Sequence, residues 1–396
     1  MTDFAFDPFD EATRRDPFPT YARARREHPV WPHPSFPVVS VFRHADVQAI
    51  LKDHAGWSSD FSIIRSDEIP PSMIATDPPV HTRLRGLVSQ AFTPRRIRAL
   101  APRITALAHE LIDAALAEGT VDLVQALTYP LPVVVIAELI GIPAADRALL
   151  KEWSDQLVAN LGLALLVPPT PERIERQLRL VNEMRAYFTR LVDERRADPR
   201  DDLLTGLVQA ELEGSRLTFD EMLQMLVLLL VAGNETTTTL IGNTVLTLLA
   251  HPDCLDAVRK DLALVPGTIE EVLRFSSPMQ LDPRRATRAT ELGGVPIAAD
   301  QIVLTWIGSA NRDEAVFARP DTFDPTRTDN RHLAFGFGPH FCLGASLATL
   351  EAEVALRVLL ERTRGFRLAT AEALPIHPSI VFRAVTRLPL VLEGRE

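Results

Sequence analysis

The sequence is poor in cysteine: its 396 residues include only Cys254 and Cys342. Two thiols cannot build the disulfide framework on which small secreted domains depend, and structural disulfides are rare in reducing compartments. We therefore expect a cytoplasmic protein in which both cysteines are free and each thiol needs its own explanation.

Long hydrophobic runs and a surplus of basic residues are also missing. The N-terminal segment has no apolar stretch of the kind found in signal peptides. The most apolar run, residues 222–232, is interrupted by Gln224 and is shorter than the about 20 residues that span a bilayer. Acidic residues outnumber basic ones, 52 to 42, which gives a net charge of -10. We expect no membrane anchor and no nucleic-acid partner, since the latter requires a basic surface.

Helical periodicity dominates what is present. Apolar residues recur at helical spacing over residues 97–117, 178–192 and 217–249. The third segment opens on Thr218 and Glu221, a capping-box spacing in which each side chain accepts from the other residue's backbone amide. Its first half is apolar almost all round, so we expect this helix to run through the centre of the molecule.

Strand signals are fewer. β-Branched residues gather in residues 37–42, 301–306 and 379–392, and Gly293-Gly294 marks a turn. The 31 prolines are scattered rather than clustered, so they indicate helix ends and loop corners, not a linker. We find no internal repeat. The patterns predict a mainly α protein with a small β region, in which residues 1–396 form a single domain.

The strongest chemical signal surrounds the second cysteine, in the run Phe335-Gly336-Phe337-Gly338-Pro339-His340-Phe341-Cys342-Leu343-Gly344. An amphipathic helix follows, and a thiol just before a helix start faces free amides and the positive end of the helix dipole, which stabilise thiolate. The glycines permit a tight turn and a close approach to the backbone. The alternative is a buried free cysteine beside an ordinary turn, and we adopt that interpretation for Cys254.

This loop matches the signature F-G-x-G-x-H-x-C-x-G of the cytochrome P450 superfamily at every fixed position. The resemblance implies the P450 fold and a haem-thiolate monooxygenase of the bacterial type, with haem b as cofactor and Cys342 as the ligand of its iron. It also assigns Phe335, Gly336, His340 and Gly344 to the haem pocket. The resemblance covers residues 70 to 395.

Three further motifs follow the order of that family. Glu271 and Arg274 resemble its E-x-x-R, whose members share a helix face and can pair. The arginine that the family adds to this pair is replaced by Thr322, and Arg327 is a possible substitute. The resemblance implies a structural role for the network.

The central helix carries Ala232-Gly233-Asn234-Glu235-Thr236, which resembles the family's A-G-x-[D/E]-T. A glycine and an acid–alcohol pair are unfavourable in a buried helix, and such exceptions are typical of functional sites. The resemblance implies that Glu235 and Thr236 deliver protons to dioxygen and that the helix widens here into a groove. For Thr237, Thr238 and Thr239 we expect hydroxyls that bond back to the preceding helical turn.

The carboxylates of haem need cationic partners. The pair His81 and Arg85 resembles the family's H-x-x-x-R, and Arg284 stands where the family has a further arginine, with Arg285 as a neighbour one residue away. His340 is the fourth candidate.

The family's substrate-contact regions correspond here to an almost wholly apolar set, which includes Ile63, Ile64, Met73, Leu228, Leu229, Gln280, Leu281, Val381 and Phe382. Plain core packing is the alternative for each one. Together they predict an apolar pocket and an apolar substrate such as a fatty acid, terpenoid or steroid, with Arg65 and Gln280 as polar candidates. A polyketide or macrolide product is the alternative.

We expect electrons from a separate ferredoxin or flavodoxin with its reductase, because no reductase domain follows. A locally basic segment, with Arg95, Arg96, Arg98 and Arg103, would attract such an acidic partner. Solvated surface arginines are the alternative. Among other functions, a peroxide-driven peroxygenase typically lacks the acid–alcohol pair, a haem-based sensor would need an output domain, and a helical scaffold would hold no cofactor.

Overall fold

The structure, a computed structural model, describes residues 4–61, 72–158, 170–212 and 214–395. Its helices are α1 (Glu11–Arg15), α2 (Phe18–Glu27), α3 (His44–Lys52), α4 (Val80–Ala91), α5 (Pro94–Ala99), α6 (Ala101–Glu118), α7 (Pro130–Ile140), α8 (Arg147–Val158), α9 (Pro171–Ala197), α10 (Leu203–Gln209), α11 (Phe219–Ala250), α12 (Pro252–Lys260), α13 (Val265–Phe275), α14 (Ile307–Ala310) and α15 (Ala345–Arg362). Its strands are β1 (Val30–Pro32), β2 (Val38–Val41), β3 (Trp57–Ser58), β4 (Thr120–Asp122), β5 (Glu211–Leu212), β6 (Ser215–Arg216), β7 (Asp282–Ala286), β8 (Thr290–Leu292), β9 (Val295–Ile297), β10 (Ile302–Thr305), β11 (Thr363–Leu368) and β12 (Pro389–Gly394). The predicted mainly helical fold is confirmed.

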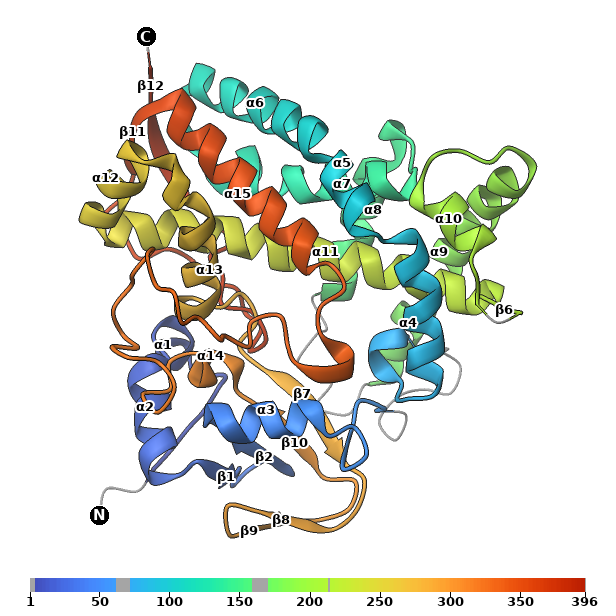
Figure 1. The fold of residues 1–396 in the computed structure, drawn as a ribbon, viewed down its shortest axis with the longest axis vertical. Helices are drawn as coiled ribbons and strands as arrows, with labels where there is room; N and C mark the ends of the chain where they lie inside the picture. The colour runs from blue at the N-terminus through green and yellow to red at the C-terminus, as the bar shows by residue number, and fades with distance from the viewer. Residues whose placement is uncertain (1–3, 62–71, 159–169, 213, 396) are drawn as a thin grey trace.

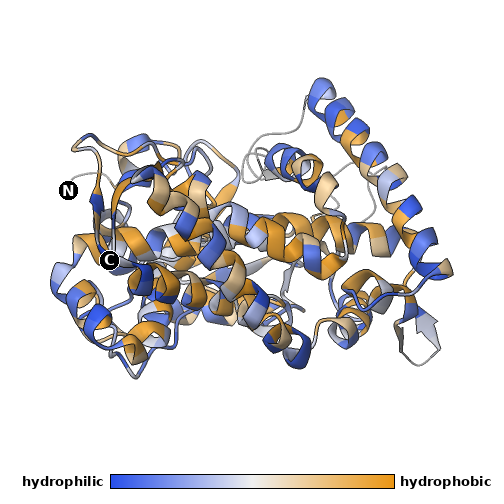
Figure 2. Cartoon of the chain, turned by 90° about the horizontal axis from the view of Figure 1, so that it is seen from above, coloured by the Kyte–Doolittle hydropathy of each residue, from blue (hydrophilic) through white to orange (hydrophobic). Residues whose placement is uncertain are grey.

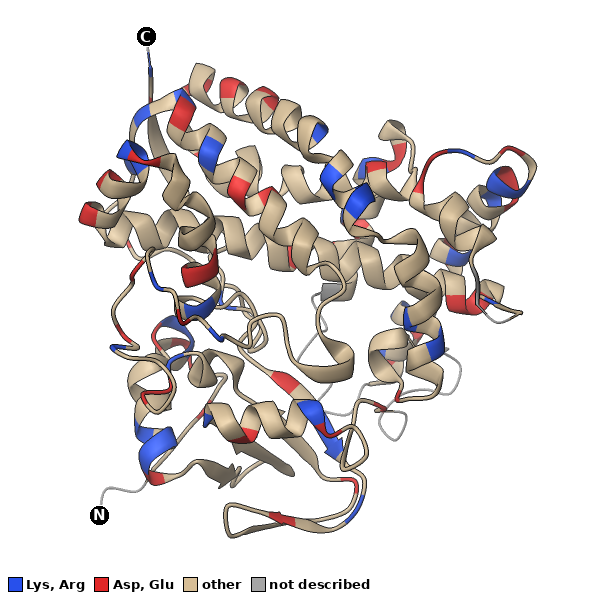
Figure 3. Ribbon diagram, in the orientation of Figure 1, with Lys and Arg blue, Asp and Glu red and all other residues tan. Residues whose placement is uncertain are grey.

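Helix α11 crosses the molecule, and α15 lies along one side of it (Figure 1). The predicted capping box is present, because the Thr218 hydroxyl accepts from the Glu221 amide at 3.2 Å and the Glu221 carboxylate accepts from the Thr218 amide at 2.8 Å. Apolar residues concentrate in the interior helices (Figure 2), whereas charged residues gather on the outer ones (Figure 3). Beyond its first turn, α11 carries only one charged residue, Glu235.

Among the described residues, α11 alone is long and apolar enough to cross a membrane by length and composition. Its surface, however, packs against α7, α8, α13 and α15. The helix therefore buries its apolar residues against the protein's own helices, as the sequence predicted.

The largest sheet has the strand order β1-β2-β10-β7-β3. Strand β10 pairs parallel to β2 and antiparallel to β7, so that Val303 lies between Val39 and Arg284. A second sheet, β11-β12-β4, closes the C-terminal end, and β8 and β9 form the hairpin predicted around Gly293-Gly294. The sheet thus brings Arg284 to the side of the molecule where the cysteine loop lies.

Two predicted elements differ from the structure. The helix expected over residues 97–117 is broken at Leu100, between α5 and α6. Pro102 explains the break, since proline cannot donate the backbone bond that would continue the helix. The strand expected over residues 379–392 begins only at Pro389; before it, the chain makes isolated bridges such as Met279 with Phe382.

Aromatic side chains close the N-terminal half of the core. Phe6, Tyr21, Phe42 and Trp306 form a buried cluster with ring centroids 4.9 to 6.3 Å apart. Phe382 belongs to the same cluster. This packing anchors the C-terminal segment, residues 374–385, beside the middle of α11.

Candidate functional site

Cys342 lies between a single 3-10 turn, Gly338–His340, and the first residue of α15. The Cys342 amide donates to the Phe335 carbonyl at 2.8 Å, which closes the loop on itself. Gly336 and Gly338 both have a φ of 72°, a conformation that favours glycine. A Cβ on Gly338 would also lie 2.7 Å from the Leu51 carbonyl oxygen, so the loop can approach α3 only with glycine at this position.

The surroundings of the Cys342 thiol shift its pKa in opposite directions. Burial raises the pKa of Cys342, while the backbone amides of Gly344 and Ala345 and the guanidinium of Arg85 favour the thiolate. The amides at the helix start are present as predicted, but burial outweighs them. A coordinated metal ion, which removes the proton from a ligating thiol, would favour the thiolate as well.

A group of basic side chains surrounds the cysteine loop. The rings of His81 and His340 lie 4.0 Å apart. The Nε2 atom of each is buried and has no hydrogen-bond partner in the described structure. Burial, followed by His81, Arg284, Arg85 and His54, lowers the pKa of His340 to about 3. Burial also lowers the pKa of His81, so both rings favour the neutral form and can donate hydrogen bonds to an acceptor.

Arg85 and Arg284 complete this basic group. Burial lowers the pKa of Arg85, and within the described residues its guanidinium forms no ion pair. Arg284 is buried and pairs with Asp282 at 2.6 Å, whereas the adjacent Arg285 pairs with Asp300 at 2.5 Å. Neighbouring residues of a strand point to opposite faces, so only one of the two can face the cysteine loop. Since Arg284 is the one that acts on His340, the structure places Arg284 there.

These residues fit an iron porphyrin with two carboxylates. Among the described residues, no three His, Cys, Asp or Glu side chains are grouped as metal ligands. A metal bound to Cys342 must therefore bring its other ligands with it, as a porphyrin iron does. Within the described ranges of the chain, the buried donors of His81 and His340 and the charge of Arg85 lack an acidic partner, which the two carboxylates would supply. Ala232 is an exposed residue in the middle of the largely buried α11, so a flat ligand can approach the helix at this point.

The acid–alcohol pair lies next to Ala232 and Gly233 on this helix. The Thr236 hydroxyl donates to the Ala232 carbonyl oxygen at 2.7 Å. We expected such bonds from the next three threonines instead, but Thr238 contacts the side chain of Asn234 and the hydroxyl of Thr239 is buried without a partner. That prediction is wrong, and α11 is a continuous helix rather than a widened one.

Glu235 occupies an apolar position with few charged neighbours. Burial, assisted by Asp155 and opposed by Lys151, raises the pKa of its carboxyl group. The Nε2 atom of His377 lies 3.9 Å from Oε1 of Glu235. The sequence held no signal for this contact, because His377 is far along the chain and belongs to no motif.

The predicted ion pair is buried and bidentate. Arg274 donates from Nε and Nη2 to the two carboxylate oxygens of Glu271, each at 2.8 Å, and both side chains are 0% exposed. Arg327 takes the third place, with its Nε 3.1 Å from each oxygen of Glu271. Thr322 contributes its carbonyl oxygen to Arg274 at 3.2 Å and not its side chain.

The predicted substrate residues are divided in the structure. Ile63, Ile64 and Arg65 lie outside the described residues. Leu228 is half-buried, whereas Met73 and Leu229 belong to the buried helical core. Val381 and Phe382 lie in the aromatic cluster.

Gln280 and Leu281 pack inside the core, which is the alternative that the sequence left open for each member of the set. Gln280 accepts from the Tyr21 hydroxyl at 3.3 Å and donates to the Ser277 carbonyl at 2.8 Å, so it is no free polar anchor. Leu281 is 0% exposed in the aromatic cluster. Sequence position alone could not distinguish them from residues that face a pocket.

The basic segment is smaller than predicted. Arg103 pairs with Glu138 at 3.0 Å and Glu110 at 3.3 Å, and Arg96 pairs with Asp201 at 3.4 Å. Arg95 and Arg98 are exposed, and neither pairs with an acidic residue in the described part of the chain. They belong to α5, which packs against α15. Phe341, next to the cysteine, is 45% exposed.

Comparisons with known proteins agree with this geometry. The cytochrome P450 family model matches residues 29–379. Erythromycin C-12 hydroxylase of Saccharopolyspora erythraea is 45% identical over 342 residues, which are 85% of either chain. The structure of CYP109Q5 from Chondromyces apiculatus is 40% identical, with a TM-score of 0.89 over 98% of both chains. The structure of CYP109E1 from Bacillus megaterium in complex with testosterone is 35% identical, with a TM-score of 0.86 over 95% of this chain and 99% of that one.

Family and site thus lead to the same assignment. The family binds haem, and bacterial members typically receive electrons from separate redox partners. Because the match extends along nearly the whole chain and includes the cysteine loop, the protein belongs to the cytochrome P450 family and is a P450 monooxygenase.

Proposed function

We propose that this monooxygenase hydroxylates or epoxidises a largely apolar organic molecule. It acts in the cytoplasm as a single domain, with electrons from a ferredoxin or flavodoxin and its reductase. The observation that carries the proposal is the basic group of His81, Arg85, Arg284 and His340 beside Cys342 at the start of α15, together with the acid–alcohol pair next to the exposed residue Ala232 of α11.

Cys342 would hold the haem iron, and His81, Arg85, Arg284 and His340 would hold its carboxylates. When bound, haem supplies the metal at which dioxygen is activated. Gly344, where a Cβ would lie 4.0 Å from the cysteine sulfur, keeps the loop open beside the thiolate. The paired charge of Arg284 would exchange part of its contact with Asp282 for the carboxylate.

In this proposal Glu235 is the proton donor and Thr236 relays the proton. The Thr236 hydroxyl uses its own proton in the bond to Ala232, so its oxygen presents lone pairs to a neighbouring donor. Glu235 retains a proton more readily than an exposed glutamate, since burial raises the pKa of its carboxyl group. A carboxyl group with a raised pKa is suited to act as a general acid near neutral pH.

The substrate class follows from the apolar character of Leu228, Val381 and Phe382 beside the middle of α11. Burial of apolar area contributes about 25 cal/mol per Å², which is enough for micromolar binding with few hydrogen bonds. Two relatives act on or bind molecules of different kinds, a macrolide and a steroid. We place steroids, terpenoids and fatty acids first and polyketide or macrolide products second, because no free polar anchor is found among the described candidates.

The test is a binding titration of the haem-loaded protein with steroids, terpenoids, fatty acids and macrolides. The measured signal is the shift of the haem spectrum towards high spin. Apolar ligands should produce this change, and Phe382→Ala should alter which of them do so. If only small charged compounds change the spectrum, the apolar-pocket proposal is wrong.

A further inference from the structure

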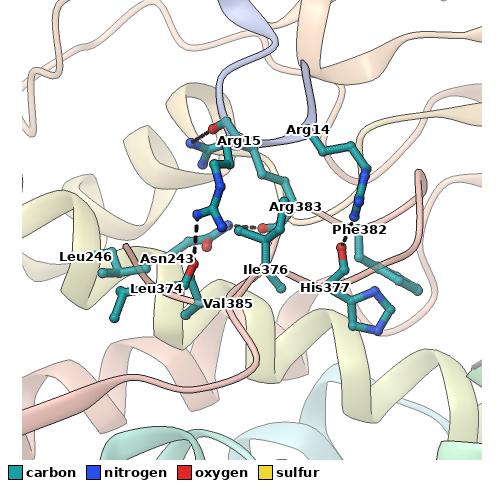
Figure 4. A pocket seen from close by; sticks show the side chains of 11 residues that line it. Arg14, Arg15, Asn243, Leu246, Leu374, Ile376, His377, Phe382, Arg383 and Val385 are labelled. Carbon is teal, nitrogen blue, oxygen red and sulfur yellow. Dashed lines mark hydrogen bonds between the residues drawn. The ribbon is translucent and has the colours of Figure 1, made fainter. Parts of the chain in front are cut away.

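A cavity of about 270 Å³ lies between α1, the C-terminal half of α11 and residues 374–385 (Figure 4). Asn243 and Leu246 of α11 form one wall, and His377 and Phe382 form another. The cavity is lined by none of the residues around Cys342, but by Phe382 of the predicted substrate set and by His377, which also reaches Glu235. Through His377, the cavity therefore extends to the carboxyl group of Glu235.

The protonation state of His377 is set by its own loop. The Ser379 amide donates to Nδ1 of His377 at 3.1 Å, so the neutral ring carries its proton on Nε2, the atom that faces Glu235. Burial and the neighbouring Arg14 lower the pKa of this imidazole. His377 is therefore a neutral hydrogen-bond donor at the inner end of the cavity.

One face of α11 joins the cavity to the acid. Glu235, Thr239, Asn243 and Leu246 follow one another at intervals of four, four and three residues, which places them in a row along the helix. The last two line the cavity. Between them and Glu235 lies the buried hydroxyl of Thr239, which has no hydrogen-bond partner in the described structure. Buried hydroxyls without a protein partner are commonly satisfied by water.

We propose that this row is the path by which protons from solvent reach Glu235. Water in the cavity, held by the Thr239 hydroxyl and by the Nε2–H of His377, passes a proton to the Glu235 carboxylate, which becomes a neutral carboxyl group. Glu235 then releases one proton towards Thr236 and returns to the carboxylate, and no electron moves. The proposal rests on the proposed function only in that Glu235 is the proton donor.

The other groups that face Glu235 define the competing path. Asp155 and Lys151 approach from α8 and form an ion pair at 2.8 Å, and Tyr129, at the start of α7, contacts Asp155 at 3.4 Å. Asp155 is exposed, so protons could also reach Glu235 from that side. A test must therefore separate the two sides of the acid.

Infrared spectroscopy of haem-loaded protein with 13C-labelled glutamate measures access to the acid directly. Glu235→Gln identifies the carboxyl band, and rapid mixing with D2O gives its rate of hydrogen–deuterium exchange. Thr239→Val should slow exchange roughly tenfold, the rate equivalent of one lost hydrogen bond. Thr244→Val is the matched control, because Thr244 is equally buried in α11 but donates to the Leu240 carbonyl.

Variants of His377 test the second group. His377→Leu should slow exchange to a similar extent, and His377→Gln, which retains an N–H donor, should restore it. Wild-type exchange rates in both Thr239→Val and His377→Leu would overturn the proposal, as would slowing by Asp155→Asn alone. If Glu235→Gln leaves the coupling of dioxygen use to product unchanged, the assignment of Glu235 as donor fails, whatever the exchange rates show.

Discussion

Arg327 donates from its Nε to both carboxylate oxygens of Glu271, at 3.1 Å each, and thereby completes a network that Arg274 begins. Removal of one partner from a buried ion pair costs about 3–5 kcal/mol, which is a large part of the stability of most proteins. We expect Arg274→Ala to give little haem-loaded protein and Arg327→Ala to be affected less, because its side chain lies at the edge of the network. Thr322→Ala is the control, since only the backbone of Thr322 takes part. The ratio of haem to protein after purification measures the effect, and a fully loaded Arg274→Ala protein would contradict it.

Arg284 and Arg285 offer a comparison between adjacent residues. Only Arg284 acts on His340, while Arg285 is bound to Asp300. We expect Arg284→Gln to release haem faster to a haem-scavenging protein, by about tenfold for one lost charged contact. Arg285→Gln should release it at the wild-type rate; equal rates for the two variants would show that Arg284 does not hold a carboxylate.

Thr236 should couple the use of dioxygen to product formation. Thr236→Ala removes the hydroxyl that is bonded to Ala232, so this variant should still consume reductant but release more peroxide and less product. Thr237→Ala, one residue further along α11, should change the ratio less. The ratio of product to peroxide, measured in the same reaction, tests this prediction. An unchanged ratio in Thr236→Ala would exclude this role.

The raised pKa of Glu235 has a consequence for stability. When the folded-state pKa of an acid exceeds its unfolded value, folding favours the protonated form, so the stability is greatest below the unfolded value and is lost as pH rises through the folded one. Above the ordinary value of 4.5, Glu235 ionises in the unfolded chain while the folded protein retains its proton up to the raised pKa, so the free energy of unfolding should fall as pH rises through this window. In urea unfolding, the free energy of unfolding of Glu235→Gln relative to that of the wild type should increase as pH rises from 4.5. This difference should become constant above the raised pKa. A constant difference across that range would be the contrary outcome.

Features with a short sequence spacing were predictable from the sequence. The cysteine loop, the capping box of α11 and the Glu271–Arg274 pair each lie within one turn or one loop, where residue types determine which groups can meet. The contacts of His377 with Glu235 and the packing of Gln280 against Tyr21 join distant segments. Such contacts depend on tertiary packing, which one sequence does not specify.

The threonines of α11 show that tertiary packing also limits prediction within a single helix. All four hydroxyls from Thr236 to Thr239 stand in one helix, and the sequence could not tell which would bond back to the helix. The outcome depends on what each face of α11 packs against: Thr236 lies near the exposed Ala232, and Thr239 is buried. Helical spacing predicts the faces, but neighbouring elements decide what each face contacts.

The assignment of Cys342 as the ligand of haem iron is tested most directly by the spectrum of the reduced protein with carbon monoxide. The wild type and Cys254→Ala should both show the red-shifted Soret band of a thiolate-ligated haem, because Cys254 lies against the Phe323 carbonyl and not in the site. Cys342→Ala should lack this band. A wild-type protein without the band, or a Cys342→Ala variant that retains it, would contradict the assignment.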